Sequence, residues 1–153
     1  MLAAKTLVII EDNPDDELLT RRALRQNNIA NPLVVLRDGA EALAYLFGTG
    51  AYAGRDPRDV PAVILLDLKL PKLDGLEVLQ RLRADPRTRL IPVVILTSSA
   101  EEQDILSGYS LGANSYIRKP VEFEAFVLAA RQLGLYWLVL NAAPPAPRSE
   151  AQP

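Results

Sequence analysis

The chain has 153 residues, enough for one ordinary domain with a core of its own but too few for a second folded domain beside it. Its composition, 49% hydrophobic and 24% charged, is typical of a globular protein, and a net charge of -2 disfavours nucleic-acid binding. Cys and His are both missing, which excludes thiol catalysis, disulfides, Ser-His-Asp triads and zinc sites built on these residues. Any chemistry must therefore use carboxylates, lysines and hydroxyls.

Five short apolar runs predict five strands. They are LVII ending at Ile10, LVVL ending at Leu36, AVILL ending at Leu66, VVIL ending at Leu96, and YI ending at Ile117. The first four are continuous rather than alternating and are rich in Val and Ile. We therefore expect these four to be buried on both faces, as parallel strands covered by helices are.

Helix-start signals lie between the runs. After the first run, Asn13 is a plausible N-cap, Pro14 takes the first helical position, and the acidic residues that follow suit the positive end of the helix dipole. After the third run, Asp74 is followed three residues later by Glu77, which predicts a second helix start.

The last two helices are predicted from similar patterns. Ser99 and Glu102 form a capping-box pattern ahead of an apolar face made of Ile105, Leu106 and Tyr109. A final helix is expected to begin near Val121. Its expected buried face consists of Phe123, Phe126, Val127 and Ala130, and Gly134 is a possible stop.

Strands that alternate with helices predict an α/β fold, a (βα)5 flavodoxin-like doubly wound parallel sheet in a single domain. We expect this domain to span residues 5–141, with an irregular insertion at residues 48–59 and a Pro- and Ala-rich disordered tail at residues 142–153. No apolar run fits a signal peptide or a membrane span, so a cytoplasmic location is expected, with neither membrane nor nucleic acid as a partner.

Polar residues follow four of the five predicted strands. Glu11 and Asp12 follow the first, Asp67 the third, Thr97 the fourth and Lys119 the fifth. In an open parallel sheet the carboxyl ends of the strands form the ligand site, so these side chains are expected to converge. Three close carboxylates repel one another unless a hard cation such as Mg²⁺ compensates them.

This set of groups suits phosphoryl transfer. Asp67 is the candidate nucleophile, while Thr97 and Lys119 are candidates to bind the charge of the phosphoryl group. Because the chain has no His, it cannot be its own phosphohistidine donor. The donor must be a partner or a small molecule.

Four motifs, VIIEDNPDD, VILLDLKLPKLDG, VVILTSS and SYIRKP, together resemble the bacterial response-regulator receiver domain of two-component signalling. The resemblance covers roughly residues 5 to 135. Within that family the chain is most similar to the small single-domain regulators paired with phytochrome-type histidine kinases, because of the long segment after Leu46, the LTSS sequence and the ending LGLYWLVLN.

The resemblance implies that a sensor histidine kinase phosphorylates Asp67, and the similarity to phytochrome-associated regulators implies a kinase of the bacteriophytochrome type. It implies that Asp12 ligates Mg²⁺ directly, that Glu11 does so through water, and that the Lys69 main-chain carbonyl completes the protein ligands. It also implies two switch residues, Thr97 and Tyr116, and a cis peptide between Lys119 and Pro120. The family usually has two Asp where this chain has Glu11 and Asp12, a departure that keeps the charge.

The expected output is a phosphorylation-dependent change of surface rather than transcription, because no DNA-binding module follows residue 135 in this sequence. The chain would then be no enzyme beyond its own phosphorylation and dephosphorylation. The apolar run from Tyr136 to Leu140 either folds back onto the core or, with the last helix, forms a homodimer surface.

Two other functions remain open. One is a pseudo-receiver, an interaction module that keeps the fold without phosphorylation. The other is an Asp-nucleophile phosphohydrolase of the haloacid dehalogenase type, disfavoured because Lys69 stands where that class has a second Asp.

Overall fold

The computed structural model describes residues 5–98, 101–119, 122–134 and 137. It contains five strands, all parallel, in the order β2-β1-β3-β4-β5. They are β1 (Leu7–Ile10), β2 (Leu33–Leu36), β3 (Val63–Leu66), β4 (Val93–Thr97) and β5 (Ser115–Arg118). The order, with β1 between β2 and β3, is that of a doubly wound sheet, so the predicted flavodoxin-like fold is confirmed.

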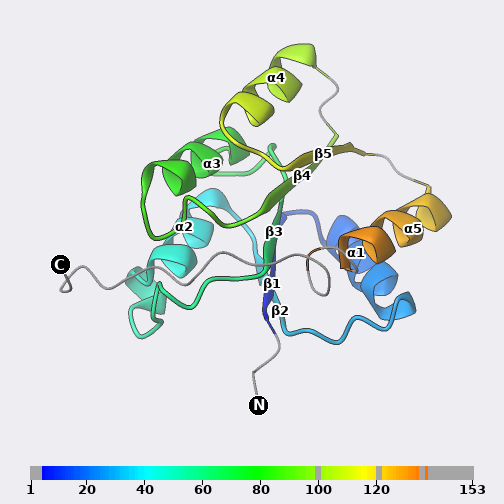
Figure 1. The fold of residues 1–153 in the computed structure, drawn as a ribbon, viewed down its shortest axis with the longest axis horizontal. Helices are drawn as coiled ribbons and strands as arrows, with labels where there is room; N and C mark the ends of the chain where they lie inside the picture. Colours follow the sequence, from blue (N-terminus) through cyan, green and yellow to red (C-terminus); the bar gives the residue numbers. More distant parts are fainter. Residues whose placement is uncertain (1–4, 99–100, 120–121, 135–136, 138–153) are drawn as a thin grey trace.

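Five helices cover the two faces of the sheet. They are α1 (Pro14–Gln26), α2 (Gly39–Phe47), α3 (Gly75–Ala84), α4 (Glu102–Ser110) and α5 (Phe123–Leu133). Helices α1 and α5 pack side by side on one face, whereas α2 and α3 lie on the other, with α4 beyond them next to β5 (Figure 1). Two helical layers enclose the apolar strands, which explains their continuous hydrophobic sequences.

Burial of the strands follows their place in the sheet. Every residue of β1, β3 and β4 is buried, as predicted. The same expectation was wrong for β2, where Leu33, Val34 and Val35 are only half-buried. The reason is that β2 lies at the edge of the sheet and pairs with β1 on one side only.

Two predicted helix caps are present. The side chain of Asn13 accepts hydrogen bonds from the N–H groups of Asp15 and Asp16, at 2.8 and 3.3 Å. Asp74 accepts one from the N–H of Glu77 at 3.1 Å. These bonds satisfy donors that the first helical turn leaves unpaired, and they fix α1 and α3 directly beyond β1 and the loop after β3.

The expectation for α4 needs correction. The helix begins at Glu102 with Glu101 as its N-cap, rather than with Ser99, which lies outside the described residues. Leu106 and Tyr109, two residues of the predicted apolar face, are about half exposed. Of the nine residues in α4 only Gly108 is buried. A β-carbon on Gly108 would lie 2.8 Å from Cδ1 of Ile95, so α4 comes very close to the sheet at this residue.

The segment at residues 48–59 is an irregular insertion, as predicted. It contains a single 3₁₀ turn, Gly50–Tyr52, and is otherwise irregular. The Arg55 guanidinium stacks 4.0 Å from the ring centroid of Tyr45 in α2 and donates to the carbonyl of that residue at 2.9 Å. The insertion is therefore packed against α2.

Helix α5 is the last element that the structure describes. In α5, Phe126 and Ala130 are buried, as predicted, while Phe123 and Val127 are half-buried. The predicted tail at residues 142–153 and most of the apolar run before it lie outside the described residues. No helix among the described residues is long and apolar enough to cross a membrane.

The contact of α3 with the end of β3 predicts a sensitive position. A β-carbon on Gly75 would lie 2.3 Å from the carbonyl oxygen of Asp67 and 2.6 Å from Cα of Leu68. Gly75→Ala should lower the free energy of unfolding by about 2 kcal/mol, as overpacking against backbone does. In urea unfolding, Gly54→Ala is the matched control, because nothing lies within 4 Å of its added carbon. Equal midpoints for the two variants would contradict the prediction.

Candidate functional site

Backbone hydrogen bonds fix three polar residues at the carboxyl edge of the sheet. The N–H of Glu11 donates to the last carbonyl of β2 at 2.9 Å, and that of Asp67 to the last carbonyl of β1 at 3.0 Å. The N–H of Lys119 donates to the last carbonyl of β4 at 2.7 Å. Each bond continues the sheet pattern one step past a strand, so the positions of these side chains follow from the strand register.

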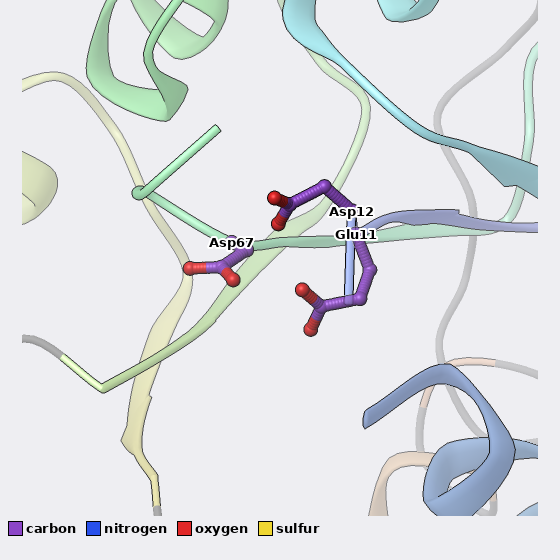
Figure 2. Close-up of side chains that lie close together, drawn as sticks. All are labelled: Glu11, Asp12 and Asp67. Carbon is purple, nitrogen blue, oxygen red and sulfur yellow. The ribbon is translucent and has the colours of Figure 1, made fainter. Parts of the chain in front are cut away.

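Three carboxylates meet at this edge. Oxygen atoms of Glu11, Asp12 and Asp67 all lie within 4.8 Å of one another. Figure 2 shows the side chains of Glu11 and Asp12, at the end of β1, extending toward the side on which Asp67 lies, at the end of β3. Glu11 and Asp67 are buried, at 4% and 7% exposure, whereas Asp12 is exposed. The cluster thus opens to solvent at Asp12.

The ammonium of Lys119 lies among these acids, and the side chain of Lys119 is 13% exposed. Its Nζ is 2.7 Å from Oε1 of Glu11, 2.8 Å from Oδ2 of Asp16 and 3.3 Å from Oδ2 of Asp67. Asp16 was not predicted as a site residue, because in the sequence it looks like an ordinary acidic residue of a helix start. The available signal was its position in the first helical turn after β1, close to the edge where the other acids meet.

Asp67 has further hydrogen-bond donors. The N–H of Lys69 donates to Oδ1 of Asp67 at 3.1 Å, and the hydroxyl of Thr97, a fully buried residue, also donates to this carboxylate. The Lys69 side chain points away from the cluster and pairs with Asp104 of α4 at 4.0 Å. Asp67 is therefore held by donors from its own loop, from β4 and from the residue after β5.

Tyr116 is not part of this cluster. It is half-buried in β5, beside Gly108 of α4, and its ring centroid lies 6.5 Å from that of Tyr109. Pro120, the other residue of the predicted cis peptide, lies outside the described residues.

The electrostatic balance keeps Asp67 ionised. Burial alone would raise the pKa of Asp67, but the hydrogen bond from Glu11 and the charge of Lys119 outweigh it and hold the pKa below its ordinary value. Burial and the neighbouring Asp67 raise the pKa of Glu11 from 4.5 to about 7. Burial opposes the charge of Lys119 as well, but its hydrogen bonds with Asp16 and Glu11 raise its pKa. As the pH falls toward 7, the first proton that the cluster takes up therefore binds Glu11 rather than Asp67.

The donor set fits a hard divalent cation. All the candidate side-chain ligands are carboxylate oxygens, and three of them lie close enough to share one ion. One ammonium among four neighbouring carboxylates leaves excess negative charge that a divalent ion would offset. Such a site, with an ionised Asp beside a lysine and a hydroxyl, can accept a phosphoryl group.

Comparison with known families agrees with this chemistry. The model of the response regulator receiver domain matches residues 7–131. The chain belongs to this family. The receiver family acts in signalling, and the match spans the sheet, all four sequence motifs and each residue of the cluster.

Individual receivers resemble the chain over nearly its whole length. Response regulator Rcp1 of Synechocystis sp. is 37% identical over 142 residues, 93% of this chain and 95% of Rcp1. A crystal structure of Rcp1 in its Mn²⁺-bound form has a TM-score of 0.82, with 35% identity over 92% of this chain and 99% of that chain.

Two other solved structures are similar. The phosphorylated cyanobacterial phytochrome response regulator RcpA has a TM-score of 0.84 and 38% identity, over 94% of this chain and 100% of that chain. The bacteriophytochrome response regulator AtBRR is 52% identical with a TM-score of 0.74, over 92% of this chain and 100% of that chain. This receiver is thus homologous to phytochrome response regulators along its described core.

The raised pKa of Glu11 predicts a pH-dependent stability. Because the folded receiver holds this proton more tightly than the unfolded chain, raising the pH from about 4.5 to about 7 should lower the free energy of unfolding, by up to about 3 kcal/mol. Above pH 7 this contribution should stay constant. Urea unfolding in EDTA measures the effect, with Glu11→Gln as the variant that should lose this slope. The same pH dependence in both proteins would disprove the assignment.

Proposed function

We propose that Asp67 is the phosphoacceptor of this receiver and that a histidine kinase is its donor. The observation that supports this assignment most directly is the state of Asp67. It is a buried carboxylate kept ionised at the end of a strand, with the Lys119 ammonium 3.3 Å away and a Thr97 hydroxyl bonded to it. An ionised nucleophile beside a fixed cation is what phosphoryl transfer requires.

In the proposed reaction an oxygen of Asp67 attacks phosphorus. A bond forms between this oxygen and phosphorus while the bond from phosphorus to the donor nitrogen breaks, and the donor histidine keeps that electron pair. Lys119 then neutralises one phosphoryl oxygen, and the hydroxyl of Thr97 donates to another. Since the chain contains no His, the donor must be another protein or a small molecule.

We propose Mg²⁺ as the cofactor. Asp12 and Asp67 would hold it directly, Glu11 through water, and the Lys69 main-chain carbonyl would complete the protein ligands. When bound, the ion supplies positive charge that offsets the carboxylates and the arriving phosphoryl group. The exposed carboxylate of Asp12 and the Mn²⁺-bound form of the similar Rcp1 support a divalent ion at this place.

We propose that the signal leaves through the face formed by α4, β5 and α5. Movement of Thr97 toward the phosphoryl group would shift the end of β4 toward the site. Tyr116 in the neighbouring strand β5 would then change rotamer. A β-carbon at Gly108 of α4 would lie only 3.5 Å from Cδ2 of Tyr116, so the Tyr116 ring packs close to the helix that its movement would affect. The Lys119–Pro120 cis peptide stays a prediction.

The proposed donor is a sensor kinase of the bacteriophytochrome type, because the similar RcpA and AtBRR are named as phytochrome and bacteriophytochrome response regulators. Histidine kinases take their phosphoryl group from ATP, so the proposed phosphoryl transfer would occur in the cytoplasm. Transfer of labelled phosphate from such an autophosphorylated kinase to this chain, absent with Asp67→Asn, tests the donor class.

Intact mass after incubation with acetyl phosphate and Mg²⁺ tests the phosphoacceptor. The wild type should gain the mass of one phosphoryl group, while Asp67→Asn and the wild type in EDTA should gain none. Asp59→Asn is the matched control, because it removes an exposed Asp outside the cluster and should react like the wild type.

No gain in the wild type, together with no binding of fluoroberyllate, would refute the proposal and favour the pseudo-receiver. Sustained turnover of a generic phosphomonoester would instead favour the phosphohydrolase.

We also propose that a second copy of the chain packs on the α4-β5-α5 face. Leu106 and Tyr109 of α4 are exposed there, and a groove bordered by Tyr109, Tyr116 and Trp137 separates α4 from α5. Trp137 itself packs against the core, which agrees with the alternative in which the last segment folds back. The rest of residues 136–140 lies outside the described residues.

Light scattering over a range of concentrations tests this contact. The wild type should show the mass of a dimer, at least when saturated with fluoroberyllate, and Tyr109→Glu should shift it toward the monomer, because a charge would be buried in an apolar interface. A monomer mass at every concentration, with and without fluoroberyllate, would rule out the dimer.

A further inference from the structure

Asp16 has a contact that the proposed reaction does not use. It belongs to the first turn of α1, and its Oδ2 lies 2.8 Å from Nζ of Lys119. The same nitrogen is 3.3 Å from Asp67, the carboxylate that it is expected to serve. In the unphosphorylated receiver the ammonium is therefore bound more closely by Asp16 than by the phosphoacceptor.

The partners of Lys119 differ in how easily each can be released. Glu11 is buried, so breaking its ion pair would leave a polar group without water. The side chain of Asp16 is 34% exposed and borders a cavity of about 240 Å³. The cavity is lined by Asp16, Leu19, Thr20, Leu96, Ser98, Lys119 and Phe126. Water can therefore solvate Asp16 as soon as the ammonium leaves it.

We infer that Asp16 is a positioning residue, an exchangeable counter-ion that holds Lys119 in the unphosphorylated state and competes with the phosphoryl group for its ammonium. This inference rests on the proposed role of Asp67. Helix α1 would then influence the equilibrium between the unphosphorylated and phosphorylated states. It would do so through Asp16, whose side chain does not touch the reacting atoms.

The charges predict two effects of opposite sign. Asp16 neutralises part of the Lys119 charge, so less of that charge reaches Asp67 and Glu11, and the carboxylates attract a metal ion more strongly. The same neutralisation weakens the attraction of Lys119 for an arriving phosphoryl oxygen. Loss of the Asp16 charge should therefore weaken metal binding and strengthen binding of a phosphoryl group.

Two titrations of the full chain separate these effects. Calorimetry with Mg²⁺ measures metal affinity, and fluorine NMR with fluoroberyllate at saturating Mg²⁺ measures affinity for a phosphoryl mimic. The test variant is Asp16→Asn, which keeps the backbone N–H that donates to the N-cap side chain of Asn13. Asp16→Glu keeps the charge and should restore wild-type behaviour.

Asp15→Asn is the matched control. It removes the same charge from the neighbouring position, but Asp15 is exposed and its side chain forms none of the ion pairs found among the described residues. Its effect therefore measures the general electrostatic change alone.

We expect Asp16→Asn to bind fluoroberyllate about threefold to tenfold more tightly than the wild type and to bind Mg²⁺ about twofold or more weakly, as for a partly buried ion pair. Asp15→Asn should stay within about twofold of the wild type in both titrations. A variant that is merely destabilised would lose affinity in both.

Equal affinities for Asp16→Asn and Asp15→Asn, or weaker fluoroberyllate binding by Asp16→Asn, would overturn the role of Asp16 while leaving Asp67 as the phosphoacceptor. Failure of the wild type to bind fluoroberyllate would instead refute the proposed function itself, so the two failures are distinguishable.

Discussion

The ion pairs of Lys119 are the interaction on which the site depends. Carboxylates gathered at the end of a buried sheet repel one another, and burial of Glu11 and Asp67 strengthens that repulsion. A single ammonium, almost enclosed and within 3.3 Å of three of the acids, offsets it. Without this cation the cluster would have to take up further protons, and Asp67 would lose the ionised state that makes it a nucleophile. The chemistry of the receiver thus begins with a charge balance that the fold imposes.

The fold imposes that balance through the strand register. Glu11, Asp67 and Lys119 follow three strands whose hydrogen bonds continue one residue past their ends, so the acids and the ammonium are fixed by backbone rather than by flexible loops. Close packing supports the same edge, because α3 begins at Gly75, where its backbone touches that of Asp67. The geometry of the polar site therefore depends on the packing of the apolar core. A change in the helix contact would move the nucleophile, and a change in strand pairing would separate the charges.

The sequence predicts those parts of the structure that depend on local pattern. Continuous apolar runs locate the strands, and Asn13 and Asp74 mark helix starts because a side-chain cap needs only neighbouring residues. The half-burial of β2 depends on strand order, which the runs do not encode. Within α4 only Gly108 is buried, and its close contact is with Ile95, which lies in another element. Asp16 joins the site only because Lys119, a residue 103 positions away, reaches it.

The Lys119 pairs also explain how a small chemical change could alter the whole face beside the site. The ammonium of Lys119, the residue after β5, binds the carboxyl groups of Asp16 in α1, Glu11 after β1 and Asp67 after β3. A phosphoryl group on Asp67 would add a stronger hydrogen-bond acceptor for the Lys119 ammonium. The ion pairs of Lys119 with Glu11 and Asp16 would then become weaker. Elements joined by one charge cannot all keep their positions when that charge is redistributed. The coupling then requires no long path through the core, because the loops at one end of the sheet already meet at a single nitrogen atom.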